Sequence, residues 1–282
     1  MSHVRNLFHK PSAHQPVPIV ASAVPATEKA ATPPDSTATA TPALPEFAIE
    51  QAHLSAESRL VYYTDPRCPA ADRYRLLRMR LKEHSRTGTL KRLFITSPLA
   101  HDGKSTVVLN LATALAERGK HTVLVVEADL HHPSLAGRLK LNPWAGLAEC
   151  LSDEATSPLS VIRRIEPLGW YLLPAGKPRR NPTELLQTLA FGRIMQTLAP
   201  GFDWILIDSP PVIPLTDSLT LQQHVDASLL VARAGTTPRE AVEQTVELLG
   251  KKNILGIVLN AVEARNHLYY QYGEYNRRTP ED

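Results

Sequence analysis

Apolar runs alternate with amphipathic segments along most of the chain after about residue 70. Five runs have the length and composition of buried strands, namely residues 93–97, 122–126, 204–207, 227–231 and 254–259. Four segments repeat apolar residues at helical spacing, namely 72–82, 104–118, 183–199 and 238–250. Continuously apolar strands that alternate with helices indicate a sheet buried on both faces. We therefore predict an α/β fold with a mostly parallel β-sheet flanked by helices.

The first 50 residues have a different composition. Residues 11–46 contain 8 Pro and 9 Ala, with four charged residues and almost no large apolar groups. Such a segment cannot bury enough apolar area to offset the entropy lost on ordering. We predict that residues 1–50 form a disordered tail. The chain has no apolar run of about 18 residues, and its first residues lack the apolar region of a secretion signal.

The remaining composition excludes several classes of function. A net charge of +3 over 282 residues argues against nucleic-acid binding driven by bulk charge. The two cysteines, Cys68 and Cys150, are too few for a disulfide framework or a zinc cluster. We therefore expect a protein of a reducing compartment.

The clearest chemical signal lies between the first predicted strand and the helix that follows it. The connecting loop ends in Gly103, Lys104, Ser105 and Thr106. In loops of this kind, backbone N–H groups bind phosphate oxygens, the lysine reaches the β- and γ-phosphates, and the hydroxyl binds Mg²⁺. The strict pattern has a glycine five positions before Gly103, where this chain has Pro98. By pattern alone, an ordinary strand–loop–helix turn is the alternative.

Three carboxylates follow predicted strands. Glu127 and Asp129 follow the strand at 122–126, and Asp208 ends the strand at 204–207. Ligands of open α/β sheets bind at the carboxyl ends of the strands. A single aspartate there can be a helix N-cap. Three carboxylates beside a phosphate loop indicate a cation instead, because without one they would repel a triphosphate.

These motifs carry a family resemblance. Residues from about 69 to 275 resemble the bacterial tyrosine kinases of the capsular-polysaccharide type (BY-kinases, CpsD/CapB-like), which belong to the same P-loop NTPase branch as the MinD and ParA ATPases. The family's Walker A, A′ and B motifs resemble residues 96–106, 124–133 and 204–211. Weaker matches are residues 172–176, 181–186 and 256–260, and the pair Asp217 and Asp226.

The resemblance implies roles for individual residues. The implied catalytic residues are Lys104, Glu127, Asp129 and Asp208, with Glu127 as the acceptor of the tyrosine hydroxyl proton. The implied nucleotide-binding residues are His101, Asp102, Gly103, Lys104, Ser105, Thr106 and Asn260. The implied Mg²⁺ ligands are Ser105, Asp129 and Asp208.

The chain departs from the family pattern after its second predicted strand. The first Walker A′ carboxylate is usually Asp and is here Glu127, which reaches one methylene further. Misplacement by about 1 Å can lower a rate about a hundredfold. The following arginine positions hold His131 and His132, which we interpret as solvated replacements and not as a metal site.

Two features separate a kinase from a simple ATPase. In the family, an acidic residue followed by arginines at +3 and +6 mediates ring assembly, and Asp72, Arg75 and Arg78 fit that spacing. A solvated helix face with ordinary salt pairs is the alternative. The second feature is a tyrosine cluster that resembles the family's autophosphorylation site, at Tyr269, Tyr270, Tyr272 and Tyr275. Its interleaved polar residues fit poorly with an aromatic edge docked on the core.

The expectation is an ATP- and Mg²⁺-dependent protein-tyrosine autokinase that regulates exopolysaccharide or capsule synthesis and export. Its kinase domain would span 51–266 and its tyrosine-rich tail 267–282. The resemblance implies a homo-oligomeric ring, an integral-membrane polysaccharide chain-length regulator as activator, and a phosphotyrosine phosphatase as a partner. We expect a cytoplasmic protein that this regulator recruits to the inner face of the membrane.

Two alternatives remain open. A MinD/ParA-type ATPase switch would bind a partner in its ATP state and modify nothing. Such switches carry an extra lysine early in the loop, which residues 98–100 lack. The second alternative is a catalytically weakened scaffold, which Glu127 and the two histidines favour.

Overall fold

The computed structural model describes residues 44–55, 58–87, 90–214 and 217–262. Most of the predicted N-terminal tail and the whole predicted tyrosine tail lie outside these ranges. No helix in the described ranges has the length and apolarity needed to cross a bilayer.

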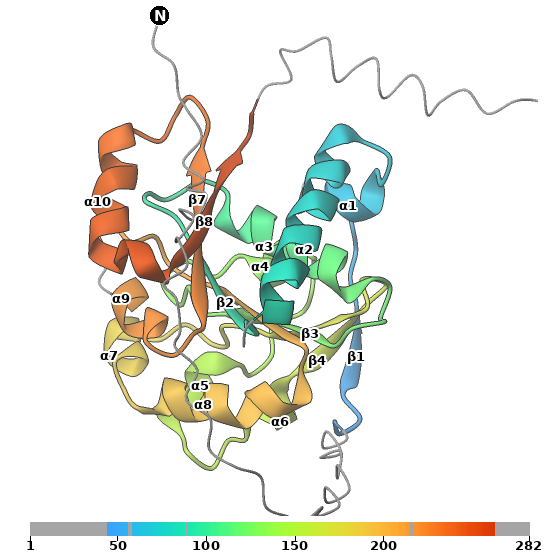
Figure 1. Ribbon diagram of the computed structural model, residues 1–282. Helices are drawn as coiled ribbons and strands as arrows, with labels where there is room; N and C mark the ends of the chain where they lie inside the picture. Colours follow the sequence, from blue (N-terminus) through green and yellow to red (C-terminus); the bar gives the residue numbers. More distant parts are fainter. Residues whose placement is uncertain (1–43, 56–57, 88–89, 215–216, 263–282) are drawn as a thin grey trace, which may run out of the picture. The chain divides into compact units, whose positions relative to one another are not determined.

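One eight-stranded sheet organises the described part of the chain (Figure 1). Its spatial order is β1-β4-β5-β3-β6-β2-β7-β8, and every neighbouring pair is parallel except β4 with β5. The strands are β1 (Ala48–Gln51), β2 (Arg92–Thr96), β3 (Val123–Glu127), β4 (Arg163–Glu166), β5 (Trp170–Leu173), β6 (Trp204–Asp208), β7 (Ala227–Arg233) and β8 (Ile254–Asn260). The predicted mostly parallel α/β sheet is confirmed.

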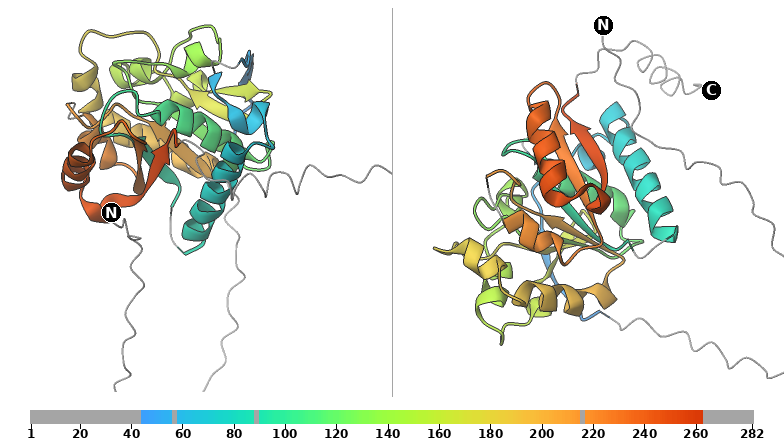
Figure 2. Two further views of the ribbon diagram at one scale, coloured as in Figure 1. Left: turned by 90° about the horizontal axis from the view of Figure 1, so that it is seen from above. Right: turned by 60° about the vertical axis from the view of Figure 1, so that its left-hand side comes forward.

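Helices cover the sheet on both faces (Figure 2). The longer ones are α2 (Pro69–Thr87), α3 (Lys104–Ala116), α8 (Ala190–Leu198) and α10 (Arg239–Leu249). The shorter ones are α1 (Val61–Thr64), α4 (Leu135–Arg138), α5 (Leu147–Ser152), α6 (Pro158–Val161), α7 (Pro182–Leu186) and α9 (Asp217–Gln222), with 3₁₀ turns at Ala199–Gly201 and Lys251–Asn253.

The central strands alternate their side chains between two apolar cores. In β3, Val123 and Val125 pack on the face covered by α3, whereas Leu124 and Val126 pack on the face covered by α5 and α8. All four side chains are fully buried. Burial on both faces explains why these strands read as continuous apolar runs.

Strands β1, β4 and β5 are elements that the sequence patterns did not predict. Each has four residues. No residue of β1 and only Ile165 of β4 is buried, so neither alternation nor an apolar run is visible in these two strands, whereas β5 is a short apolar run. Strand β1 begins two residues before the predicted domain boundary at residue 50, and the preceding Phe47 packs on the core through Tyr171 and Phe202.

The single helix predicted over 183–199 is wrong, because the segment forms α7 and α8 with a break between them. At the break, the Thr188 backbone N–H and hydroxyl both donate to the Leu185 carbonyl, at 3.3 and 2.8 Å. A threonine hydroxyl that bonds a nearby backbone carbonyl competes with continued helix.

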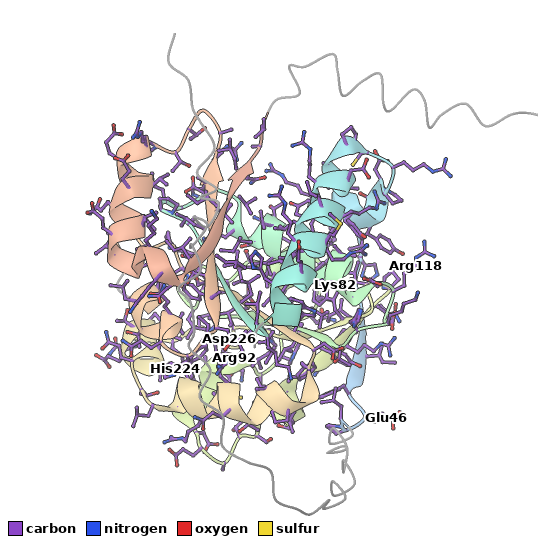
Figure 3. All side chains as sticks on the ribbon, in the orientation of Figure 1. Glu46, Lys82, Arg92, Arg118, His224 and Asp226 are labelled. Carbon is purple, nitrogen blue, oxygen red and sulfur yellow. The ribbon has the colours of Figure 1, made fainter. Side chains whose placement is uncertain are left out.

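Asp226 fixes the start of β2 at the end of the sheet away from the loop after Thr96 (Figure 3). It accepts hydrogen bonds from the Lys91 and Arg92 backbone N–H groups at 2.9 and 2.7 Å, and from the Arg92 guanidinium at 2.6 Å. Burial acts to raise the pKa of Asp226, but these hydrogen bonds outweigh it and hold the pKa below its usual value. This family-matched aspartate is therefore structural.

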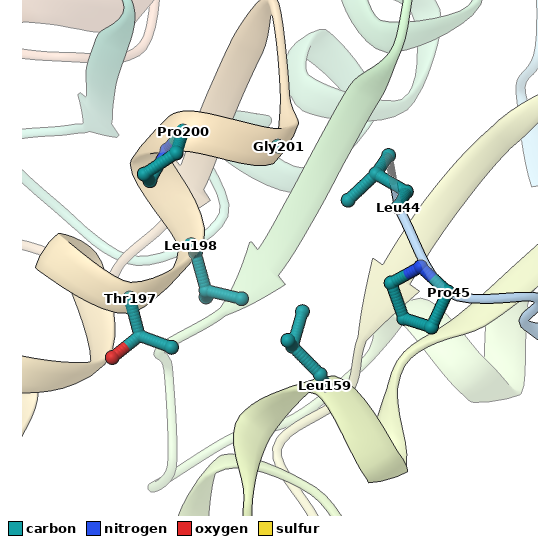
Figure 4. A pocket seen from close by; sticks show the side chains of 7 residues that line it. All are labelled: Leu44, Pro45, Leu159, Thr197, Leu198, Pro200 and Gly201. Atoms are coloured by element: carbon teal, nitrogen blue, oxygen red, sulfur yellow. The ribbon is translucent and has the colours of Figure 1, made fainter. Parts of the chain in front are cut away.

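An apolar groove lies at the same end of the sheet, where the chain enters the described region (Figure 4). Its lining residues come from the entry segment, from α6, from the end of α8 and from the 3₁₀ turn that follows it, and are Leu44, Pro45, Leu159, Thr197, Leu198, Pro200 and Gly201. Since ligands of such sheets bind beyond the opposite, carboxyl ends of the strands, this groove is not the candidate active site.

Candidate active site

The loop between β2 and α3 is braced from within by Asp102. This side chain is 2% exposed, and its carboxylate accepts hydrogen bonds from the Leu99 backbone N–H at 3.0 Å and the Thr237 hydroxyl at 2.6 Å. The neighbouring His101 has a left-handed φ of 66° and an exposed side chain. Asp102 therefore shapes the loop with its side chain.

Gly103 lies where the loop turns into α3, in a backbone conformation that strains any residue with a side chain. Its φ is +100°, and a Cβ atom would lie 2.0 Å from Asn260 Nδ2. The same Asn260 amide donates to the Asp102 carbonyl at 2.9 Å. The end of β8 thus contacts the loop directly. The Asn260 side chain packs against the backbone of Gly103, which has no side chain of its own.

The sheet brings the predicted acidic residues together with Lys104. Asp208 at the end of β6 is in register with Glu127 on β3 and with Ile95 on β2, so it lies between those two strands. Lys104 Nζ is 3.7 Å from Asp129 Oδ2, and both residues are buried. The spatial grouping that the motifs predicted is therefore present.

Asp208 carries a polar atom that lacks a partner. The residue is 1% exposed, and its Oδ1 has no hydrogen-bond partner among the described residues. Burial raises the pKa of Asp208 to about 7, although the Lys104 charge and the Ser105 hydroxyl act to lower it. A buried carboxylate oxygen without a donor fits a cation or its bound water as the missing partner.

The site resembles a magnesium site of the kind that is completed by substrate. No group of three or more His, Cys, Asp or Glu residues in the described ranges could hold a metal ion unaided. Mg²⁺ commonly takes one or two carboxylates and keeps waters and substrate phosphates for its other positions. Asp208, Asp129 and the Ser105 hydroxyl therefore fit Mg²⁺ together with a bound phosphate.

Glu127 has contacts that the sequence did not reveal. One carboxylate oxygen accepts from the backbone N–H groups of Ser134 and Leu135, at 2.6 and 2.7 Å. The other accepts from the Ala175 N–H at 3.1 Å. Burial raises the pKa of Glu127, while these three hydrogen bonds act in the opposite direction. Glu127 thus ties β3 to the start of α4 and to the segment after β5.

The expectation that His131 and His132 are both solvated is wrong for His131. Its Nε2 is 2.7 Å from Asp217 Oδ2, and the Thr183 hydroxyl donates to the same carboxylate at 3.2 Å. Asp217 is fully buried and its other oxygen has no partner among the described residues, so His131 and Thr183 supply the side-chain contacts of this carboxylate. His132 is exposed, and its backbone N–H donates to Asp129.

Arg138 is a site residue that the motifs did not indicate. It ends α4, and its Nη1 donates to the Thr106 hydroxyl at 3.0 Å. Thr106 lies in the first turn of α3, next to Ser105, whose hydroxyl is 3.3 Å from that of Ser134. The short helix α4 therefore packs directly against the phosphate loop.

The predicted assembly residues lie on α2. Arg75 pairs with Asp72 at 2.6 Å on the exposed side of the helix. Arg78 turns towards the end of α3, where it donates to the Ala114 carbonyl at 3.2 Å and lies 3.5 Å from Glu117. Arg78 therefore has contacts within the subunit, and the ring-forming role of all three residues stays a prediction. The predicted phosphoacceptors Tyr269, Tyr270, Tyr272 and Tyr275 lie outside the described residues.

Comparisons with known proteins agree with this geometry. The family described as the CobQ/CobB/MinD/ParA nucleotide binding domain matches residues 93–279. Tyrosine-protein kinase CpsD of Streptococcus agalactiae is 34% identical over 191 residues, which cover 67% of this chain and 82% of the relative. The kinase domain of Escherichia coli tyrosine kinase ETK superposes with a TM-score of 0.69 at 26% identity, covering 73% of this chain and 81% of that one.

Some relatives are much longer than this chain. Tyrosine-protein kinase ptk of Acinetobacter johnsonii is 34% identical over 172 residues, which are 60% of this chain and 23% of the relative. The chain thus corresponds to about a quarter of that protein.

Proposed function

Because this chain belongs to the bacterial tyrosine kinases of the CobQ/CobB/MinD/ParA nucleotide-binding family, we propose that it transfers the γ-phosphate of ATP to tyrosines of its own C-terminal cluster, residues 269–275. One observation carries the proposal. A loop lysine and carboxylates from two neighbouring strands meet at the carboxyl end of the sheet, with one buried carboxylate oxygen left for a ligand.

The loop and Lys104 bind the nucleotide in this proposal. The backbone N–H groups of residues 101–106 surround the phosphates at the start of α3, and Lys104 supplies a positive charge to the β- and γ-phosphates. Asp129 keeps the lysine amino group at the site before nucleotide binds. Asn260 contributes by holding the loop backbone in shape.

Ser105, Asp129 and Asp208 would hold Mg²⁺, and the bound ion would neutralise negative charge on the nucleotide phosphates. Asp208 contributes the oxygen that lacks a partner. A hydrogen bond from the Ser105 hydroxyl acts to lower the pKa of the same carboxylate. Because burial raises the pKa of Asp208, a proton on this carboxylate would compete with a cation for the same oxygen.

Glu127 is our candidate for the acceptor of the tyrosine hydroxyl proton. A carboxylate offers about four acceptor positions, and three of them are used by backbone N–H groups. The pKa that burial raises makes Glu127 a stronger base than an exposed glutamate. The role rests on its position beside Asp208 and on the family motif.

The biological setting of the proposal rests on family membership alone. Subunits assemble into a ring through Asp72, Arg75 and Arg78, so that the tyrosine tail of one enters the site of its neighbour. An integral-membrane chain-length regulator activates the kinase at the inner face of the membrane, and a phosphotyrosine phosphatase reverses the modification. The pathway served is exopolysaccharide or capsule synthesis and export.

Lys104→Met tests the nucleotide chemistry. We expect the variant to stay folded and to lose phosphotyrosine formation with ATP and Mg²⁺, with a lower melting temperature because the buried Asp129 loses its partner. The matched control is Lys252→Met on the exposed turn before β8, which should keep the wild-type rate. Wild-type ATP hydrolysis without any phosphotyrosine would favour the ATPase switch, and an active Lys104→Met variant would contradict the proposed loop function.

A further inference from the structure

The positive charge of Arg138 lies at the start of α3 with no negatively charged partner among the described residues. Its guanidinium contacts Thr106 in the first turn of α3, where the free backbone N–H groups create a positive potential. No carboxylate of the described residues lies within 4.0 Å of Arg138, in contrast to Arg78, which pairs with Glu117. A half-buried cation at a helix N-terminus is unfavourable unless an anion joins it there.

The position of Arg138 is built into the fold. Helix α4 has four residues and ends at Arg138, and its start is fixed by the two hydrogen bonds from Ser134 and Leu135 to Glu127. Leu135 is fully buried in the core beneath α3. The contact with Thr106 therefore joins two anchored elements, and Arg138 is held at the loop before any ligand arrives.

We propose that Arg138 binds the phosphates that ATP and ADP share, at the side of the loop marked by Thr106. The inference rests on the proposed nucleotide site and adds a residue to it. Phosphate loops surround the α- and β-phosphates with backbone N–H groups, and their lysine reaches the β- and γ-phosphates. Thr106 is two residues further into the helix than Lys104, so Arg138 approaches the phosphate chain from the α/β side.

The chemistry of the side chain fits this role. A guanidinium has five N–H donors in a planar fork, and the contact with Thr106 uses one of them. The remaining donors match the oxygens of a phosphate better than a lysine could. His131, which stands where the family has arginine, is engaged with Asp217, so it does not supply this cation.

The test is the affinity of the full chain for ADP without Mg²⁺ and for ATP with Mg²⁺, measured by isothermal titration at one fixed salt concentration. Arg138→Gln should weaken both affinities by about 10-fold or more, since hydrogen bonds to charged groups are among the stronger ones. Arg239→Gln, which removes an equivalent charge from the exposed start of α10, should bind both nucleotides like the wild type.

A second variant keeps the test valid if Arg138→Gln folds poorly. Arg138→Lys retains the charge and most of the packing but loses the fork, so we expect a few-fold weaker binding of ADP with an unchanged melting temperature. Wild-type affinity in Arg138→Gln or Arg138→Lys would overturn this inference and leave the kinase proposal intact. A wild-type chain that binds neither nucleotide would overturn both, and an effect on ATP alone would contradict the assignment to the shared phosphates.

Discussion

The Glu127 side chain ends between two backbone segments, the start of α4 and the residue Ala175 after β5. An aspartate at this position would end one methylene earlier and could not reach both segments without a shift of the strand. Glu127 therefore has a structural role, which is to join these two segments, in addition to its proposed catalytic role. Substitution at this residue should affect folding and rate together.

We predict that Glu127→Gln lowers the free energy of unfolding by about 1–3 kcal/mol, because an amide presents a donor where backbone N–H groups need an acceptor. If Glu127 is also the base, the phosphorylation rate of the folded variant should fall by a further factor of about 10²–10⁴. Urea denaturation and initial rates separate the two effects. Glu243→Gln, on the exposed face of α10, is the control. Unchanged stability in Glu127→Gln would refute the structural role.

The raised pKa of Asp208 predicts a pH dependence. In the folded protein without ligands its pKa is about 7, against an ordinary value of 3.8. Between these values the folded state holds a proton that the unfolded chain has lost, so stability falls as the pH rises from about 4 to 7.

Asp208→Asn removes the titrating carboxyl group and with it the loss of stability between about pH 4 and 7. We therefore expect the variant to be more stable than the wild type at pH 8, by a few kcal/mol at most since each pKa unit corresponds to about 1.4 kcal/mol. The difference should shrink towards pH 5. Urea midpoints measured with a chelator and without nucleotide would show it, with Asp65→Asn in an exposed turn as control. A constant difference across this range would contradict the assignment.

At the scale of elements, the phosphate loop depends on strand β8 as much as on the strand and helix that it connects. Asn260 holds the Asp102 carbonyl and fills the space beside Gly103. The family match at residues 256–260 already implies a role for Asn260, but its contact with the Asp102 carbonyl is visible only in the fold.

Gly103→Ala should abolish nucleotide binding, because its Cβ would meet the Asn260 amide and its φ of +100° is strained for any L side chain. Adding Asn260→Ala removes the collision but leaves the strain, so the double variant should recover binding only in part. Gly235→Ala has a φ of +68° with nothing near its Cβ, and it should keep wild-type affinity. Calorimetric titration with ADP compares the three, and normal binding by Gly103→Ala would refute this account of the loop.

At the scale of the whole molecule, the apolar pattern predicts the strands that are buried on both faces. Leu206 and Ile207 in β6 show why, since each enters a different core. The pattern fails for β4, where Ile165 is the single buried residue and the flanking arginines resemble a loop. Chain topology then brings Asp129 and Asp208 together, because neighbouring parallel strands end at the same edge of the sheet.

The contact between α4 and the phosphate loop could not be predicted from the sequence. Thr106 and Arg138 are 32 residues apart, and their meeting depends on how the segment after β3 turns back over the loop. No periodicity or motif encodes that turn. The same holds for His131, whose partner Asp217 lies 86 residues further along the chain.

The central claim is that the site built around this phosphate loop phosphorylates the C-terminal tyrosines of this protein. Each phosphate would add about −1.5 to −2 charges at pH 7, so multiple modification should expel the tail from the acidic site. The most direct measurement is mass spectrometry of the tail peptide after incubation of the purified chain with ATP and Mg²⁺. We predict phosphate on Tyr269, Tyr270, Tyr272 or Tyr275 in the wild type and none in Lys104→Met. An unmodified wild-type tail, or equal modification in both chains, would contradict the claim.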